Sequence, residues 1–488
     1  MIVLGIDCGT SALKALLVDG AATLASAAEP YEPDRPRPGW SEQDPAVWRL
    51  AMERALRTLR AAAPIAYARV AAISFSGQMH GLVALDGADR PLRPAMLHND
   101  GRAAAEAQEL WERHRDIADI VGVKPMPGFL GPKALWLARH EPETLRAART
   151  ICLPKDFLRL GLCGARVTDV SDAAGAWWLD EAKREWCAPA IEACGARLSQ
   201  APGLVEASQA VGRIRPEAAD ALGLARHVVI GAGGGDAPVG AVGLGAIHRG
   251  DAFISLGTAS QLVVVSDRYA AASETLVHSF AHAAPARWYR MGAMLTGASA
   301  LAFAGRLFQT DVATLEREAS GAPESDVLFL PYLQGERTPH DDARARGVFF
   351  GLDASTTRSA CARAVMEGVA FTLVDAQKAL AGTGDTFQRV SLIGGGAKSR
   401  FWARLIASAL GCEVALHQGG ETGPALGAAR LAQAAAGEDL QALASAPPIQ
   451  EILAPEAALR EGLLSRHARF SALYSALKPE FARLQTRS

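Results

Sequence analysis

The feature that most constrains the fold is a repeated pattern of apolar segments that end in glycine-bearing turns. Two such turns lie early in the chain, near Asp7 and Gly231, and two lie later, near Gly257 and Gly394. Short apolar runs bounded by glycine are typical of buried strands, and glycine permits the sharp turn at their ends. The recurrence predicts an α/β fold whose two halves are variations on one domain.

The periodicity of the apolar residues predicts strands and helices in alternation. We expect strands at 2–6, 14–19, 70–75, 227–230, 252–256 and 390–393, and helices at 44–60, after Asp236, at 401–410 and over the tail 450–488. The tail is predicted to pack on the body of the protein rather than to form a dimer contact.

The length of the chain indicates two domains. With 488 residues it exceeds what one hydrophobic core normally holds, so two domains of roughly 240 residues each are expected. Apolar residues make up 49% of the chain and charged residues 21%, a balance typical of a globular protein. We predict domains at 1–245 and 246–488, with an active-site cleft between them.

Charge and cysteine content exclude several classes of function. The formal net charge is −2 with both signs mixed along the chain, which argues against nucleic-acid binding. No apolar run reaches the ~18 residues of a membrane span, so a cytoplasmic protein without a membrane partner is expected.

The seven cysteines are scattered without a C-x-x-C pair, which argues against disulfides and a zinc site. The sequence leaves a homodimer open.

The glycine turns are suited to a nucleotide triphosphate, because backbone N–H groups can approach its charged oxygens closely. None of the turns matches a P-loop or a complete dinucleotide-binding fingerprint. Two carboxylates, Asp7 and Asp236, each follow a strand at such a turn and could face one cleft. Mg²⁺ is typically held by one or two carboxylates together with phosphates and water, so Asp7 fits the metal side and Asp236 the acceptor side.

A second group of polar residues follows the strand predicted at 70–75. Met79 offers an adaptable apolar surface, and His80 offers a donor or an acceptor for a small polar substrate. A purely structural histidine remains the alternative at this position.

Together these motifs resemble the FGGY family of carbohydrate kinases, whose fold belongs to the actin and hexokinase superfamily of two ribonuclease-H-like domains. The segments that carry the resemblance are 5–11, 40–45, 77–81, 99–102, 153–156, 171–175, 233–236, 255–258, 330–340, 394–399 and 423–429. Ordered matches of this number span nearly the whole chain, and the resemblance is strongest to the members that phosphorylate D-xylulose.

The resemblance implies ATP-dependent phosphorylation of D-xylulose at its C5 hydroxyl. Asp236 would accept the proton, Asp7 and Asp236 would support Mg²⁺, and Met79 and His80 would contact the sugar. The ATP-binding residues it implies are Gly9, Thr10, Ser11, Gly257, Thr258, Gly395, Gly396 and Ala397. The domain at 1–245 would bind the sugar and supply the catalytic base, and the domain at 246–488 would bind the nucleotide. The segment 335–340, including His340, would shape the hinge side of the cleft.

Two positions depart from the pattern of those members. His98 stands where Trp is frequent, and Ala237 stands where Asn is common. The loss of an amide beside Asp236 removes one possible sugar hydrogen bond. A kinase for L-xylulose, D-ribulose, erythritol or glycerol therefore stays open, and an actin-like ATPase or a non-catalytic sugar-binding regulator is a more distant alternative.

Overall fold

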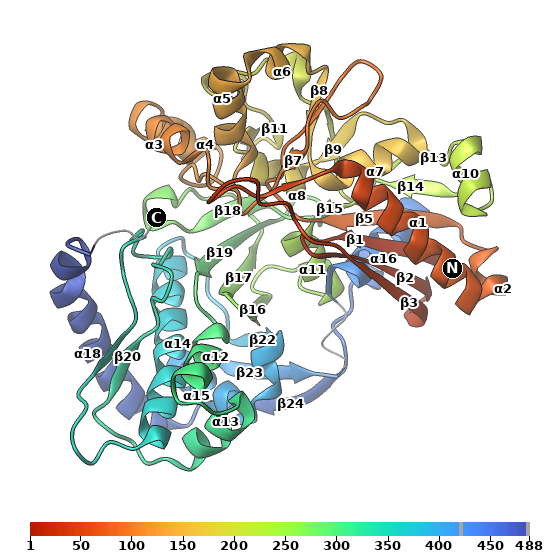
Figure 1. Ribbon diagram of the computed structural model, residues 1–488. Coiled ribbons are helices and arrows are strands. Elements are labelled where there is room, and N and C mark those ends of the chain that lie inside the picture. The colour runs from red at the N-terminus through yellow and green to blue at the C-terminus, as the bar shows by residue number, and fades with distance from the viewer. Residues whose placement is uncertain (419–422, 485–488) are drawn as a thin grey trace.

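The computed structural model describes residues 1–418 and 423–484, and contains two mixed seven-stranded sheets. The first has the order β13–β14–β5–β1–β2–β3, with β15 paired to β5 (Figure 1). Its strands are β1 (Ile2–Cys8), β2 (Ala12–Asp19), β3 (Ala22–Pro30), β5 (Ala72–Gly77), β13 (Ala210–Arg213), β14 (Val229–Gly231) and β15 (Gly234–Gly235).

The second sheet has the order β18–β19–β17–β16–β22–β23–β24. Its strands are β16 (Ala252–Leu256), β17 (Ser260–Ser266), β18 (His278–Ala281), β19 (Trp288–Met294), β22 (Arg389–Ile393), β23 (Glu413–His417) and β24 (Ile449–Leu453).

The two sheets share one topology. In the first, β1, β2 and β3 are antiparallel neighbours, β5 is parallel to β1, and β14 is parallel to β5. In the second, β16, β17 and β19 repeat the antiparallel part, and β22 and β23 repeat the parallel part. The prediction of two related α/β domains is therefore confirmed.

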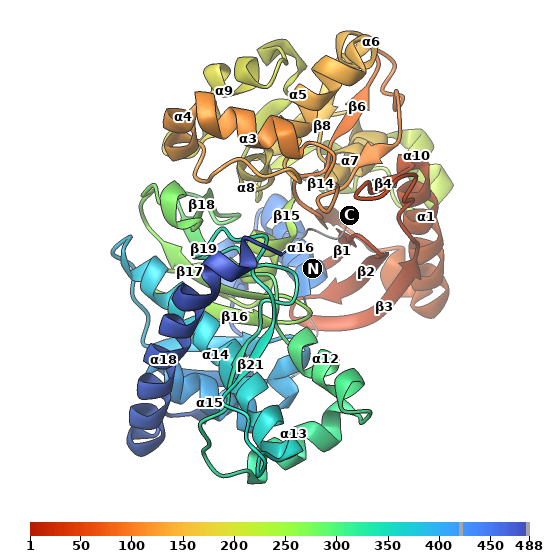
Figure 2. The same ribbon diagram turned by 60° about the vertical axis from the view of Figure 1, so that its left-hand side comes forward.

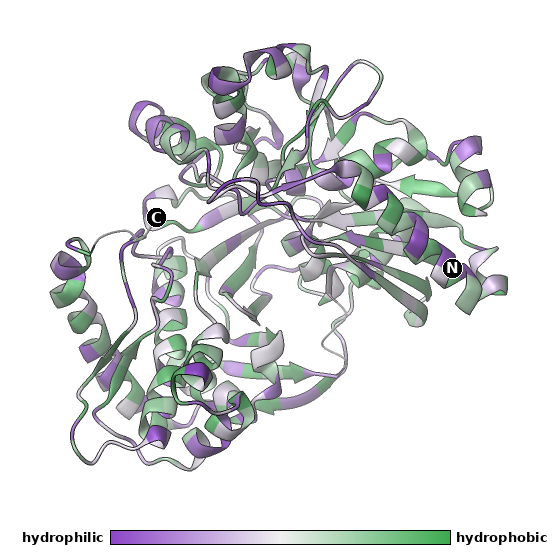
Figure 3. Ribbon diagram, viewed as in Figure 1, coloured by the Kyte–Doolittle hydropathy of each residue, from purple (hydrophilic) through white to green (hydrophobic). Residues whose placement is uncertain are grey.

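Helices cover both faces of each sheet. Next to the first sheet lie α1 (Pro45–Ala62), α2 (Pro64–Tyr67), α7 (Pro154–Cys163), α10 (Pro216–Leu222), α11 (Asp236–Gly243) and α16 (Gly423–Ala435). The second half adds α12 (Ser299–Leu307), α13 (Val312–Gly321), α14 (Arg358–Ala381), α15 (Arg400–Leu410), α17 (Leu440–Leu443) and α18 (Ala457–Phe481). The apolar residues (green in Figure 3) gather on the strands and on the sheet-facing sides of these helices.

Helix α1 shows how the sequence sets one of these elements. Asp44 caps its N-terminus by accepting a hydrogen bond from the N–H of Ala46 at 2.9 Å, and Pro45 occupies the first helical position. Trp48, Met52 and other apolar residues at helical spacing are buried against the sheet.

A large insertion between β5 and β13 forms a cap at the top of Figures 1 and 2. It contains α3 (Ala104–Arg113), α4 (Arg115–Ile120), α5 (Leu130–His140), α6 (Pro142–Ala147), α8 (Val170–Ala173) and α9 (Ala188–Ala193). Its apolar core continues into residues of β17, β18 and β19, so the cap and the second sheet share one buried cluster.

The short strands pair outside the two main sheets. They are β4 (Glu42–Gln43), β6 (Val83–Leu85), β7 (Ala95–Met96), β8 (Thr150–Cys152), β9 (Val167–Asp169), β10 (Leu179–Asp180), β11 (Glu185–Trp186), β12 (Gly203–Val205), β20 (Leu328–Leu330) and β21 (Val348–Phe350).

Helix α16 crosses from the late part of the chain to the first sheet. A Cβ on Gly5 would lie 2.1 Å from the Ala425 carbonyl oxygen, and a Cβ on Gly427 would lie 1.9 Å from that of Val239. Both positions require glycine because backbone approaches backbone there. The late helix therefore covers β1, and belongs in space with the first sheet (Figure 1).

The predicted tail helix is partly wrong. Residues 449–453 form the edge strand β24, which pairs with β23, and the helix begins only at Ala457. Residues 485–488 of the predicted helix lie outside the described residues. Helix α18 buries Phe470 and Tyr474 against the second half, as its predicted packing on the body requires. No helix within 1–418 and 423–484 is both long and apolar enough to span a membrane.

Candidate active site

Two cavities are lined by residues from both halves of the chain. One, of about 410 Å³, contains the predicted residues Met79, His80 and Asp236. The other, of about 830 Å³, contains Gly395 and Ala397. The predicted sugar residues therefore line the first cavity, here called the sugar-side cavity, and two of the eight predicted nucleotide residues line the second.

Asp236 is the first residue of α11, directly after the short strand β15 that pairs with β5. The N–H of Ala237 donates to Asp236 Oδ1 at 2.8 Å. Burial, together with the neighbouring charge of Asp7, raises the pKa of Asp236 to about 7. An ordinary aspartate titrates near 3.9, so this carboxylate is a better proton acceptor than the sequence suggested.

Asp7 lies near the end of β1, opposite Lys14 on β2 and beside Ser76 on β5. It is 8% exposed, and its Oδ1 has no hydrogen-bond partner among the described residues. Burial raises its pKa to about 6. Two buried carboxylates with raised pKa values, one of them with an unsatisfied oxygen, fit a divalent cation held jointly with phosphates. The described residues contain no cluster of three or more metal-ligating side chains.

A cluster of buried charges supports the strand that leads to Asp236. Lys155 Nζ lies 2.7 Å from Asp156 Oδ1, 2.9 Å from Asp169 Oδ1 and 3.2 Å from Asp172 Oδ2, and these side chains are almost fully buried. A Cβ on Gly234 would lie 2.6 Å from Ser171 Oγ in the same cluster. The segments 153–156 and 171–175 are therefore linked by ion pairs, and the second packs against β15.

His80 has φ 71°, and its ring stacks on Phe129 with centroids 4.3 Å apart. Burial holds the pKa of His80 well below its usual range, so the imidazole is neutral. Its Nδ1 lies 2.8 Å from the carbonyl oxygen of Gly175 and must donate, because a carbonyl only accepts. The lone pair at Nε2 is then left to accept a hydrogen bond. Met79 Sδ lies 3.9 Å from the hydroxyl of Tyr289.

The second half contributes to the sugar-side cavity, which the sequence prediction of sugar binding by residues 1–245 missed. Gln261, His278, Met291 and Arg337 line it together with Asp236. Burial and the charge of Arg337 lower the pKa of His278 to about 3. The Gly335–His340 motif was the available signal for Arg337.

His340 itself lies elsewhere. Its ring stacks on Tyr474 of α18 at 3.8 Å, and its Nε2 lies 3.1 Å from the Tyr332 hydroxyl. His98, in contrast, lines the sugar-side cavity, and its Nδ1 lies 3.4 Å from both Thr10 Oγ1 and Gln78 Oε1. His98 thus connects this cavity to the turn at 9–11.

Lys14 is another residue that sequence reasoning missed. It lines the 830 Å³ cavity and also a neighbouring cavity of about 380 Å³ that contains Asp7. A cation at this junction suits the phosphates of a nucleotide. The sequence carried one signal for Lys14. It lies between the apolar residues Leu13 and Ala15, which are buried, so its side chain must point to the opposite face of β2.

The glycine turns contribute unequally to the larger cavity. Gly394, at φ +89°, turns the chain after β22, and Gly395 is open to the cavity. Gly396 instead faces the sheet, where a Cβ would lie 2.4 Å from the side chain of Leu256.

The turn after β16 is fixed by hydrogen bonds that its carbonyl oxygens accept from the backbone of residues 297 and 298. The Thr258 carbonyl accepts from Gly297 N–H at 2.8 Å, and the Gly257 carbonyl accepts from Ala298 N–H at 2.7 Å. In the part of the chain that the structure describes, neither Gly257 nor Thr258 lines the 830 Å³ cavity. On the opposite turn, the Gly9 carbonyl accepts from the Tyr31 hydroxyl at 2.6 Å.

Known proteins resemble the chain over its whole length. It is 43% identical to the xylulose kinase of Escherichia coli (strain K12) over 98% of this chain and 100% of the relative. A crystal structure of a xyloylose kinase from Brucella ovis superposes with a TM-score of 0.96 at 41% identity, covering 98% of this chain and 100% of that one.

The crystal structure of xylulose kinase from Rhodospirillum rubrum has a TM-score of 0.92 at 28% identity, with 99% and 100% covered. These likenesses confirm the predicted fold of the actin and hexokinase superfamily. The models of the N-terminal and C-terminal domains of the FGGY family match residues 2–243 and 252–436. The chain belongs to the FGGY family of carbohydrate kinases.

Proposed function

We propose that this protein transfers the γ-phosphoryl group of ATP to the C5 hydroxyl of D-xylulose. The observation that carries the proposal is the Asp236 carboxylate, which lies in the 410 Å³ cavity with a pKa raised to about 7 and with Asp7 close by. The full-length relatives named xylulose kinase support D-xylulose as the acceptor.

In the proposed reaction Asp236 accepts the proton of the C5 hydroxyl. The bond from that oxygen to the γ-phosphorus forms as the bond from phosphorus to the β–γ bridging oxygen breaks, giving D-xylulose 5-phosphate and ADP. When bound, Mg²⁺ neutralises phosphate charge, and Asp7 and Asp236 are the side chains that would hold it through phosphates and water.

The sugar is held by residues from both halves of the chain. The neutral imidazole of His80 accepts a hydrogen bond from a sugar hydroxyl at Nε2, and Met79 supplies an apolar surface beside Gly235. Arg337 donates from the opposite wall. Base catalysis contributes about 10²–10⁴-fold, whereas correct positioning of the reactants is worth roughly 7–11 kcal/mol, so orientation is the larger effect.

The nucleotide is proposed to occupy the 830 Å³ cavity. Gly395 and Ala397 line it directly, and Lys14 contacts the phosphates. The turns at Gly9, Thr10 and Ser11, at Gly257 and Thr258, and the backbone of Gly396 complete the proposed ATP site. We place the division between the two domains at 245/246.

Release of ADP from MgATP tests the proposal directly. D-Xylulose should stimulate it more than D-ribulose, L-xylulose, erythritol or glycerol, and Asp236→Ala should abolish the stimulation. Stimulation by another sugar alone would show that the protein is a kinase of this family with a different acceptor. ADP release that ignores every sugar would favour an ATPase instead.

A further inference from the structure

We propose that Lys133 is a positioning residue of the sugar-side cavity, whose ammonium group fixes three separate chain segments that present side chains to the sugar. The proposal rests on the kinase function above and concerns how the acceptor is selected. Lys133 lies near the start of α5 and is fully buried.

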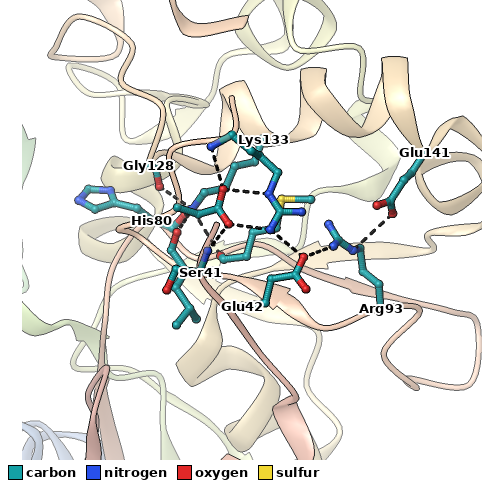
Figure 4. Close-up of polar contacts among 11 residues, drawn as sticks. Ser41, Glu42, His80, Arg93, Gly128, Lys133 and Glu141 are labelled. Carbon is teal, nitrogen blue, oxygen red and sulfur yellow. Dashed lines mark hydrogen bonds and ion pairs between the residues drawn. The ribbon is translucent and has the colours of Figure 1, made fainter. Parts of the chain in front are cut away.

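The contacts of Lys133 are unusual because they are all to main-chain carbonyl oxygens. Its Nζ lies 2.6 Å from the Gly128 oxygen, 2.6 Å from that of Leu97, 3.1 Å from that of His80 and 3.4 Å from that of Met96 (Figure 4). No carboxylate in the described part of the chain forms an ion pair with it. Carbonyl dipoles that converge on one point repel one another, so the N–H donors of Lys133 are what allows these segments to meet. Burial lowers the pKa of Lys133 to about 7, and the charge of Asp100 opposes this shift.

Each tethered segment places a side chain in the cavity. His80 is itself a cavity residue, His98 follows Leu97, and Phe129 follows Gly128. The rings of His80 and Phe129 stack at 4.3 Å, so one ammonium group holds the backbone beneath both members of the stack. Lys133 therefore sets the position of the imidazole that is proposed to bind the sugar.

The backbone at His80 needs such support. A non-glycine residue at φ 71° is strained and persists only where its surroundings hold it. Two hydrogen bonds hold His80 in this conformation. Lys133 donates to its carbonyl oxygen, and its ring Nδ1–H donates to the carbonyl oxygen of Gly175.

The segment around His98 is fixed independently. Asp100 accepts from Ser41 N–H at 2.7 Å and from Arg102 Nε at 2.9 Å, and Arg102 Nη2 also lies 2.7 Å from Glu42 Oε1. Figure 4 shows this network beside Lys133, and Arg93 extends it to Glu141. Loss of Lys133 should consequently displace His80 and Phe129 more than His98.

The test compares Lys133→Met with Gln200→Met. Gln200 is a matched control because its buried Nε2 also donates to main-chain carbonyls, those of Leu145 at 2.7 Å and Ala148 at 2.9 Å, and it does not line the cavity. Melting temperature, kcat and the KM of each substrate are measured for both variants.

We expect Lys133→Met to raise the sugar KM on the order of 10- to 100-fold, with the KM for ATP changed less than about twofold. Gln200→Met should lower the melting temperature and leave both KM values unchanged. Lys133→Gln, which keeps two N–H donors, should give an intermediate sugar KM, and this variant serves if the methionine variant does not fold.

A sugar KM in the folded Lys133 variants equal to that of Gln200→Met would overturn the positioning role. Failure of the proposed function shows itself in the unmodified protein instead, as phosphorylation of a different sugar. The Lys133 comparison is then made with that sugar.

Discussion

The first turn of each sheet has the same place in the topology but a different chemistry. In the first sheet, Asp7 on β1 pairs with Lys14 on β2, two residues before the Gly9 turn. In the second sheet, Ser255 on β16 pairs with Gln261 on β17, two residues before the Gly257 turn. The first hairpin carries a pair of opposite charges where the second carries a neutral polar pair.

In the proposed reaction this difference gives the two hairpins different tasks. The charged hairpin lies near Asp236 and contributes Lys14 to the 830 Å³ cavity, so it would serve the groups that carry charge during transfer. The neutral hairpin contributes Gln261 to the sugar-side cavity, where an uncharged substrate needs hydrogen bonds rather than counterions.

The largest effect should come from making the first hairpin resemble the second. Asp7→Ser should lower kcat about 10²- to 10³-fold, because the carboxylate on the magnesium side is lost. Coupled measurement of ADP at saturating substrates checks this. Ser255→Ala is the control and should lower kcat less than about fivefold. Equal losses in the two variants would remove the proposed asymmetry.

The burial of Asp236 and its repulsion by Asp7 should also affect the stability of the protein. The pKa of Asp236 is raised in the folded state, so its favourable contribution is present below the unfolded pKa and is lost as the pH rises through about 7. Asp236→Asn should therefore gain about 2–3 kcal/mol more stability at about pH 8.5 than at about pH 5. Urea unfolding at both pH values measures this gain.

Asp353→Asn is an informative contrast in the same assay. Hydrogen bonds from Ser355 lower the pKa of Asp353, so its contribution is lost as the pH falls. The two variants should thus show opposite pH trends, and parallel trends would argue against a raised pKa at Asp236.

The parallel strands that follow the hairpins also end differently. Gly77 ends β5 in an extended conformation, whereas Gly394 after β22 has φ +89° and a Cβ there would lie 2.8 Å from the Leu256 carbonyl oxygen. Gly394→Ala should cost about 2 kcal/mol of unfolding free energy. Gly395→Ala, with nothing within 4 Å of its added Cβ, is the matched control and should cost little.

The smallest effect concerns the cation of the first hairpin. Lys14→Gln should raise the KM for ATP about tenfold and leave the sugar KM unchanged, because a charge-assisted contact to phosphate is lost. Lys124→Gln, which removes an ion pair with Asp341 outside both cavities, should leave the KM for ATP unchanged. A change in the sugar KM without a change in the KM for ATP would show that Lys14 contacts the sugar rather than the nucleotide.

Much of the first half could be predicted from the sequence, because its functional residues are close to local signals. Asp7 lies near the end of an apolar strand just before Gly9, Asp236 follows a strand that ends in Gly235, and His80 comes three residues after β5. The geometry of their surroundings could not be predicted. Arg337 and Gln261 reach the sugar-side cavity only because the cap packs on the second sheet.

Other features run against the usual behaviour of residue types. A lysine is normally exposed, so nothing local indicates that Lys133 is fully buried among carbonyl oxygens. The strand at 449–453 was predicted as helix because it is only five residues long and precedes an alanine- and leucine-rich stretch. Its pairing with β23 decided its conformation.

The position of α16 has a consequence for the order of folding during synthesis. Val3 and Ala72 on the first sheet are buried against Ala429 and Ala432 of α16, which the ribosome makes long after the last strand of that sheet. The earliest sheet therefore emerges with one apolar face uncovered until most of the chain exists. The first sheet should therefore complete its packing only after α16 is made, and the nascent first half should expose apolar surface of the kind that chaperones bind.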